Sequence, residues 1–223
     1  MALVLNIETA TTNCSVSLSK DGETLVLKED NSAGYSHAET LHVFIKDVFE
    51  AANINTLDID AVAVSKGPGS YTGLRIGVSS AKGLCYALNK PLISVSTLES
   101  LSRQVKAEEG IIIPMLDARR MEVYSAIFNH NHELIREIKA EILTEDSYAD
   151  LLKENKVYFV GNGVAKTKQL INHPNAIFID GKLPSANEMG SISEMKHKKS
   201  DIEDVAYFEP YYLKDFVAIK KKA

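Results

Sequence analysis

Two stretches of sequence that share one pattern decide the fold. LVLNIETATTNCSVSL spans residues 3–18, and IIPMLDARRMEVYSAI spans residues 112–127. Each has an apolar run ending in an acidic residue, a short polar segment and a second apolar run, which is the pattern of a β-hairpin. The second stretch lies 109 residues after the first. The chain is therefore expected to contain an internal repeat.

The segments after each hairpin continue this repeat in outline. In the first half, the pattern predicts a strand at 25–29, a helix at 36–52, a strand at 60–67, a helix at 72–88 and a strand at 90–96. In the second half, it predicts a strand at 133–142, a helix near 145–153, a strand at 157–161, a helix after Gly163 and a strand at 176–180. Each β-β-β-α-β-α unit should place helices on a mostly parallel sheet with one antiparallel hairpin. The predicted fold class is α/β with two lobes.

The same pattern gives the expected domain boundaries. Residues 1–95 form the predicted first lobe, residues 96–213 the second, and residues 214–223 a segment that is a candidate for returning to the first lobe. A helix at 96–109 should join the lobes. The charged stretch 194–215 is the other candidate for bringing the chain back to the first lobe.

The composition is typical of a globular protein. Of the 223 residues, 45% are hydrophobic, which is enough for a sizeable core, and the net charge of −5 predicts no whole-chain attraction to nucleic acid. Cys14 and Cys85 have no metal or redox spacing, so reduced thiols are expected. The N-terminus has no basic leader, and no apolar run approaches the roughly 18 residues of a membrane span. We expect a cytoplasmic protein.

The glycine-rich stretch KGPGSYTGLRIGVSSAKG, residues 66–83, fits neither of two known phosphate loops. Leu74 follows Gly73 where a P-loop needs lysine, and the spacing of Gly67, Gly69 and Gly73 is one residue too long for the dinucleotide fingerprint. A tight strand-to-helix turn is predicted instead, with Ser70 or Thr72 as the helix cap. The amides at that helix start could still attract an anion. The turn residues are Gly67, Pro68, Gly69, Ser70, Thr72, Gly73 and Arg75.

Glycines inside the predicted helix indicate a close neighbour. Each costs roughly 0.5 to 1 kcal/mol of helix stability relative to alanine, so close backbone approach is the expected reason for keeping them. This neighbour is either part of the same lobe or part of another molecule, and the sequence does not decide between these two hypotheses.

Histidine and glycine spacing argues against an independent enzyme. His37 and His42 would point about 140° apart on a helix and could not share a metal ion, and His130 and His132 are expected in an exposed turn. ATP-binding lobes need an acid followed by glycines in each hairpin. Glu8 and Asp117 supply acids, but no glycine follows either. The remaining candidates for a weak anion contact are Thr9, Thr11 and Arg119, the last of which could instead pair with a carboxylate.

Five stretches together resemble the bacterial TsaB family, also called YeaZ. They lie in the family's order and span nearly the whole chain: IETATTNCSVSL, KGPGSYTGLRIGVSSAKGL, SVSTLESL, DARRMEVY and EPYYLKDFVA. The resemblance implies the two-lobed actin-like, sugar-kinase-like ATPase fold with ribonuclease H-like lobes. It also implies work in forming N6-threonylcarbamoyladenosine at position 37 of tRNAs that read codons beginning with adenine.

The resemblance further implies a non-catalytic role beside the related protein TsaD, which carries the transfer chemistry and the metal. TsaB pairs with TsaD, completes the assembly with the small ATPase TsaE, meets tRNA only through that complex and also forms homodimers. The resemblance implies that no metal or cofactor is required. It does not decide whether a nucleotide binds at the partner interface. The alternatives are an active ATPase or kinase of the same fold and a metalloprotease, which the histidine spacing disfavours.

In the family, the two long helices of the first lobe pack against those of the partner. The resemblance therefore implies a partner interface, some of whose residues must instead face the sheet. The polar stripe with His42, Lys46 and Glu50 on one helix, and that with Arg75, Ser79, Lys82 and Tyr86 on the other, should rim this contact or meet solvent. Gly77→Arg is expected to block pairing and leave the monomer folded. The implied interface residues are Leu41, Phe44, Ile45, Val48, Leu74, Gly77, Val78, Ala81 and Cys85.

Overall fold

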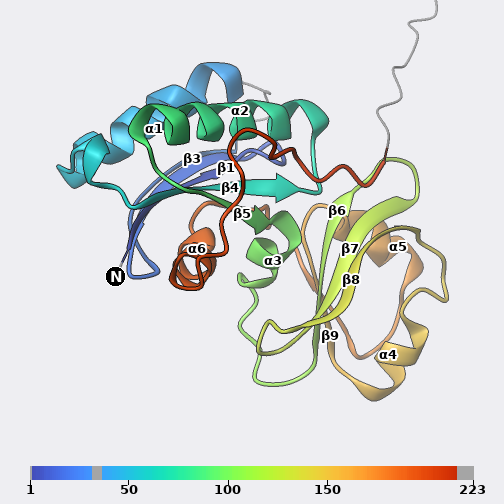
Figure 1. The fold of residues 1–223 in the computed structure, drawn as a ribbon. Coiled ribbons are helices and arrows are strands. Elements are labelled where there is room, and N and C mark those ends of the chain that lie inside the picture. The colour runs from blue at the N-terminus through green and yellow to red at the C-terminus, as the bar shows by residue number, and fades with distance from the viewer. Residues whose placement is uncertain (1, 32–36, 215–223) are drawn as a thin grey trace, which may run out of the picture.

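The computed structural model describes residues 2–31 and 37–214, which form two lobes around one five-stranded sheet each (Figure 1). The first sheet has the strand order β3-β2-β1-β4-β5 and the second β10-β9-β6-β7-β8. Read from its other edge, the second sheet repeats the order of the first. The predicted fold class and the internal repeat are confirmed.

The strands of each sheet follow one another closely along the chain. The first sheet contains β1 (Leu3–Glu8), β2 (Cys14–Lys20), β3 (Glu23–Asp30), β4 (Ala61–Gly67) and β5 (Leu92–Ser96). The second contains β6 (Ile111–Asp117), β7 (Glu122–Asn129), β8 (Leu134–Ile142), β9 (Val157–Val160) and β10 (Ala176–Ile179). In both, the first strand is antiparallel to the second, which follows it after a short turn, and parallel to the fourth, which the chain reaches from the third strand through a helix.

The helices of the two lobes differ greatly in length. The first lobe carries α1 (His37–Ala52), a 3-10 turn η1 (Thr56–Asp58) and α2 (Tyr71–Leu88), with 16 residues in α1 and 18 in α2. The equivalent helices of the second lobe, α4 (Ala149–Glu154) and α5 (Val164–Leu170), have six and seven. Residue 36, the predicted start of the first helix, lies outside the described residues. Within the described part of the chain, only the first lobe therefore presents a pair of long helices.

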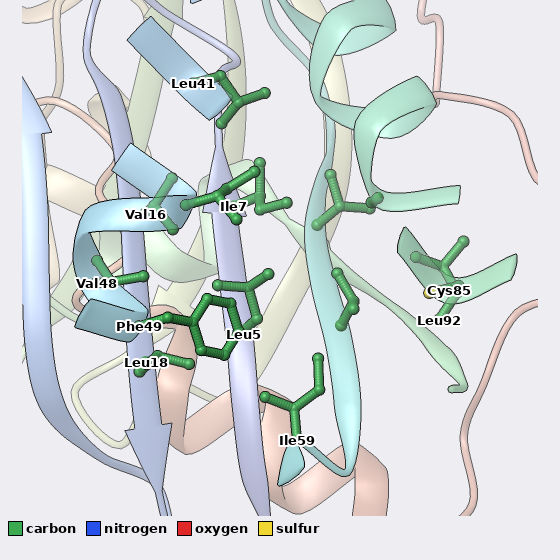
Figure 2. Packing of buried hydrophobic residues seen from close by; sticks show 14 of the residues in the cluster. Leu5, Ile7, Val16, Leu18, Leu41, Val48, Phe49, Ile59, Cys85 and Leu92 are labelled. Atoms are coloured by element: carbon green, nitrogen blue, oxygen red, sulfur yellow. The ribbon is translucent and has the colours of Figure 1, made fainter. Parts of the chain in front are cut away.

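The apolar faces of α1 and α2 cover one face of the first sheet. Figure 2 shows Leu5 and Ile7 of β1 beneath Leu41, Val48 and Phe49 of α1. These side chains are at most 5% exposed. Their burial removes apolar surface from water, which is the main favourable contribution to folding.

The opposite face of this sheet is covered by α6 (Met189–Lys198), which follows the second lobe in the chain. Met189 and Ile192 pack with Val4, Ala63 and Ile93. The predicted boundary of the second lobe at residue 213 is therefore wrong. The chain returns to the first lobe before α6, because the β1–β4–β5 face needs an apolar cover.

Helix α3 (Thr97–Ser102) lies between the lobes and is shorter than the predicted helix at 96–109. Its Ser96 cap accepts a hydrogen bond from the Glu99 amide at 3.5 Å. Leu98 and Leu101 pack against Ile112 of the second sheet. The helix therefore joins the lobes, as predicted.

Residues 199–214, named here the C-terminal strap, run back along the first lobe (Figure 1). The Glu203 amide donates to the Leu92 carbonyl at 2.8 Å, and the Tyr211 amide donates to the Lys66 carbonyl at 2.7 Å. At its end, Lys214 pairs with Glu122 of the second lobe. The predicted return to the first lobe is confirmed for the strap, while residues 215–223 lie outside the described part of the chain. Within residues 2–31 and 37–214, no helix is both long and apolar enough to cross a membrane.

Candidate functional site

The predicted strand-to-helix turn lies at the carboxyl end of β4. Ser70 is the cap of α2: its Oγ accepts from the Gly73 amide at 3.3 Å, and its own amide donates to the Ala10 carbonyl at 2.7 Å. Helix α2 begins at Tyr71, so Thr72 lies in its first turn and is exposed. Gly67 precedes a cis bond to Pro68 and has φ +111°, a region that favours glycine.

Glycines of this turn and helix make room for the β1–β2 turn of the same lobe. A Cβ would lie 2.4 Å from the Ala10 carbonyl oxygen at Gly69, 2.1 Å from the Thr9 carbonyl oxygen at Gly73, and 2.3 Å from Thr9 Oγ1 at Gly77. The close neighbour of these three glycines is therefore part of the same lobe and not another molecule. Gly83 differs, because a Cβ there would meet nothing within 4 Å.

The implied partner interface needs correction, because most of its residues lie inside the lobe. Phe44 alone is half-buried, and the other eight are buried. Helices α1 and α2 lie side by side on one sheet, so these residues form the stripes that cover it. The buried residues are Leu41, Ile45, Val48, Leu74, Gly77, Val78, Ala81 and Cys85.

The other side of the two helices forms an exposed surface, which we name the outer helix face. Val43 is 53% exposed and Tyr86 is 87% exposed. His42 Nε2 lies 3.4 Å from Ser80 Oγ, which links α1 to α2 at this surface. The predicted polar stripes lie here too, apart from two residues that contact the strap: Arg75 donates to Tyr212 at 3.2 Å, and Lys82 donates to the Phe208 carbonyl at 2.9 Å. The face consists of His42, Val43, Lys46, Glu50, Ser79, Gly83, Tyr86 and Ala87.

A cleft of about 640 Å³ lies between the lobes, at the carboxyl ends of β1, β4, β6 and β9. The first lobe contributes Thr11, Thr12 and Ser70, and the second contributes Asp117, Arg119 and Asn162. Of the predicted anion contacts, Thr11 and Arg119 line this cleft. Thr9 does not line it, because its hydroxyl donates to the Gly73 carbonyl at 2.8 Å inside the lobe.

The acidic residues of the two hairpins have different surroundings. Asp117 is exposed at the cleft, where Oδ1 lies 3.0 Å from Lys166 Nζ and accepts from the Arg119 amide at 2.6 Å. Glu8, its equivalent in the repeat, is fully buried. Burial raises the pKa of Glu8 from 4.5 to about 7, while hydrogen bonds from the Ala10 amide and neighbouring groups offset part of the rise. Of these two equivalent acids, only Asp117 is therefore accessible at the cleft.

The histidines lie apart. His37 is buried and its Nε2 donates to the Thr11 carbonyl at 2.6 Å, whereas His42 is exposed, so their five-residue spacing separates them as predicted. His130 and His132 are half-buried, which corrects the expectation of an exposed turn: Ser102 at the end of α3 lies 3.5 Å from His132 Nδ1. Among the described residues, no group of three or more His, Cys, Asp or Glu side chains could hold a metal ion.

Two features of the cleft were missed from the sequence. Asn162 accepts from the Asp117 amide at 2.8 Å, in a Gly-Asn-Gly turn whose Gly161 has the same φ of +111° as Gly67. The sequence Gly-Pro-Gly at the end of β4, residues 67–69, recurs as Gly-Asn-Gly after β9, residues 161–163. This recurrence could have predicted the turn at Asn162. At the rim, the Arg75 guanidinium lies 4.1 Å from the Tyr71 ring centroid, and its Nε donates to Tyr212 at 3.2 Å.

The two free cysteines are expected to be unreactive in the folded protein. Both are buried, and burial raises the pKa of each thiol, to about 12 for Cys85. A disulfide-exchange reagent at pH 8 should label neither cysteine in native protein and both after unfolding in guanidinium. Rapid labelling of native protein would contradict the burial of Cys14 and Cys85.

Comparison with known proteins supplies the family. The sequence is 31% identical to the tRNA threonylcarbamoyladenosine biosynthesis protein TsaB of Escherichia coli, over 98% of this chain and 97% of that protein. The chain belongs to the TsaB family. TsaB of Bacillus subtilis is 29% identical over 75% of this chain and 74% of its own length. The family model described as "TsaD: tRNA N6-adenosine threonylcarbamoyltransferase" matches residues 31–222.

The solved structures agree with the fold. YeaZ from Pseudomonas aeruginosa superposes with a TM-score of 0.80 at 25% identity, covering 96% of this chain and all of that chain. The likeness covers nearly the whole chain, so the TsaB resemblance inferred from the sequence is confirmed for the family and for the fold.

Proposed function

We propose that this TsaB-family protein is a non-catalytic partner of TsaD in forming N6-threonylcarbamoyladenosine at position 37 of tRNAs that read codons beginning with adenine. The outer helix face carries the proposal. It belongs to the only long helix pair among the described residues and exposes Val43 and Tyr86. An exposed aromatic beside apolar and small residues is typical of a protein-binding surface.

The chemistry of the outer helix face suits a close helix-to-helix contact. Ser79, Gly83 and Ala87 recur every four residues on the exposed side of α2, so they lie in one row. Small side chains let a second helix approach, while Tyr86 beside them supplies apolar area and a hydroxyl. Lys46 and Glu50 pair with each other at 3.4 Å and are exposed at the edge of this surface. We infer that TsaD and a second copy of this chain use the same surface and therefore compete.

The cleft supports the non-catalytic part of this proposal. Glu8 is buried, Asp117 is paired with Lys166, and Lys214 is paired with Glu122, which leaves Arg119 as a charged group of the cleft with no ion pair among the described residues. An ATPase or kinase would use acids in both hairpins to hold metal and phosphates. Purified protein should therefore show no ATP turnover. Turnover that follows the protein through purification would favour the ATPase alternative.

Reconstitution tests the partner role. TsaD, TsaE, the adenylate-forming enzyme and substrate tRNA are assayed with and without this chain, and the modified nucleoside is quantified. The proposal expects modification to fall at least tenfold without it. Full modification in its absence would refute the partner role.

The proposal requires no cofactor for pairing with TsaD, and a nucleotide at the interface is a separate, optional element. Affinity for TsaD is measured by calorimetry with and without ADP or ATP. Equal affinities are expected if the helices alone make the contact. A tenfold gain with nucleotide would instead indicate a nucleotide bound at the interface. Work on tRNA through this complex fits a cytoplasmic location.

A further inference from the structure

The backbone passes between the lobes at two places that are anchored on the first sheet. At the start of α3, Thr97 Oγ1 lies 2.6 Å from Ser65 Oγ of β4. Before α6, the Ala186 amide donates to Ser15 Oγ of β2 at 2.8 Å. We name residues 96–98 and 184–187 the crossing segments. Any change in the angle between the lobes has to be accommodated by these segments.

Glu8 lies between the two anchors. Strand β1 is the central strand between β2 and β4, and Glu8 stands directly opposite Ser15 in the β1–β2 ladder. Opposite residues of an antiparallel pair point to the same face. On this face lie Ser15 with one crossing segment and Ser65 with the other. The carboxyl is therefore placed where both crossing segments meet the sheet.

The Glu8 carboxyl is incompletely satisfied in this position. The side chain is 0% exposed, and Oε1 accepts from the Ala10 amide at 2.6 Å. Oε2 is buried without a hydrogen bond of its own among the described residues. The Ser65 hydroxyl, which also lies 2.6 Å from Thr97 Oγ1, and the Thr9 amide interact with the carboxyl and offset part of the rise in its pKa. A buried carboxylate with few donors is costly, whereas a neutral carboxyl is tolerated.

Among the described residues, no positive charge offsets the raised pKa of Glu8. Ser15, Ser65 and Thr97 are neutral, and the thiol of Cys14 has its pKa raised chiefly by burial and also by the charge of Glu8. Glu99 on α3 is paired with Arg103 at 3.5 Å. Other ionisable groups of the surrounding elements include Lys66 on β4, Glu188 before α6, whose pKa burial raises, and His37, which is bonded to the Thr11 carbonyl.

We propose that Glu8 is a proton-responsive residue of the hinge between the lobes. When the carboxyl is neutral, the crossing segments stay closed on the sheet. When it is ionised, local opening that admits water becomes more favourable. This couples the mobility of the hinge to proton concentration.

The direction of the pH dependence follows from the pKa of Glu8 in the closed form and in the opened form. In the closed form the pKa of Glu8 is raised by burial to about 7, and in an opened, hydrated form it approaches the ordinary 4.5. The open form therefore binds fewer protons, and opening becomes more favourable as pH rises from 4.5 to 7 and levels off above 7. From pH 6 to pH 8 the opening constant should rise roughly tenfold.

Two measurements on the full chain test the proposal. Carbon-13 NMR of the side-chain carboxyls follows the Glu8 signal, assigned by its loss in Glu8→Gln, and should give a midpoint near 7. Amide hydrogen exchange of the crossing segments, corrected for the intrinsic pH dependence, should show protection falling roughly tenfold from pH 6 to pH 8. In Glu8→Gln, which mimics the neutral carboxyl, protection should be independent of pH.

The matched control is Asp117→Asn, because Asp117 is the equivalent acid of the second hairpin and is exposed. This variant should keep the wild-type pH profile of the crossing segments. A Glu8 midpoint near 4.5 would overturn the proposal, and through-bond correlations in wild-type protein assign the Glu8 signal if Glu8→Gln does not fold. Equal pH dependence in wild type and Glu8→Gln, or a flat profile in wild type, would also overturn it.

Discussion

Gly77→Arg is expected to unfold the first lobe, not to leave a folded monomer that cannot pair. A Cβ at Gly77 would lie 2.3 Å from Thr9 Oγ1, the hydroxyl that donates to the Gly73 carbonyl. An arginine there has to displace the β1–β2 turn or lift α2 from the sheet. We expect a loss of about 3 kcal/mol or more in the free energy of unfolding, at the upper end of overpacking effects.

The measurement is thermal and denaturant unfolding followed by circular dichroism. Gly77→Ala separates the two contributions, because alanine favours a helix by about 1 kcal/mol over glycine and would stabilise the protein if space allowed. We expect it to destabilise. The matched control is Gly83→Arg in the same helix, where a Cβ meets open space. Equal midpoints for the two arginine variants would contradict the packing of α2 on Thr9.

Gly83→Arg is expected to abolish partner binding while the chain stays folded. The arginine would project from the centre of the outer helix face, between Ser79 and Ala87, and hold a second helix away. Disrupting the centre of an interface typically costs 2 kcal/mol or more, so affinity for TsaD should fall roughly 30-fold or more. The unfolding midpoint should match wild type.

Calorimetric titration of TsaD with each variant checks this result. Gln169→Arg adds the same charge at an exposed position of α5 in the second lobe and should bind like wild type. Tyr86→Ala should lose affinity without adding charge, because it removes the most exposed aromatic of the face. Wild-type affinity in both Gly83→Arg and Tyr86→Ala would place the contact elsewhere.

The order of strands and helices along the chain was predictable because hairpin patterns are local. The two strands of each antiparallel pair are neighbours in the sequence. The second copy of the pattern, at residues 112–127, supported the prediction made from the first. Helix α6 was not predicted. Within Met189–Lys198, Met189 and Ile192 are the apolar residues that pack on the first sheet, and no side chain caps the start. Its place depends on an apolar sheet face formed almost a hundred residues earlier, which no local pattern contains.

The sequence also did not show which side of each helix faces the sheet and which side is exposed. Both sides of α2 carry small or apolar residues, so periodicity could not separate Val78 and Ala81, which face the sheet, from Gly83 and Tyr86, which face outward. Close approach at Gly73 and Gly77 was correctly inferred, but the neighbour, Thr9, is more than sixty residues away in sequence. Long-range contacts of this kind come only from the assembled fold.

The most direct test of the partner role is the rate of tRNA modification in the reconstituted system as Gly83→Arg is titrated to high concentration. If this chain acts by binding TsaD and supplies no reacting group, the variant should need roughly 30-fold more protein and then reach the wild-type rate. Gln169→Arg should follow the wild-type curve. A Gly83→Arg rate that stays low at saturating, demonstrably bound protein, or a curve identical to wild type, would contradict the account.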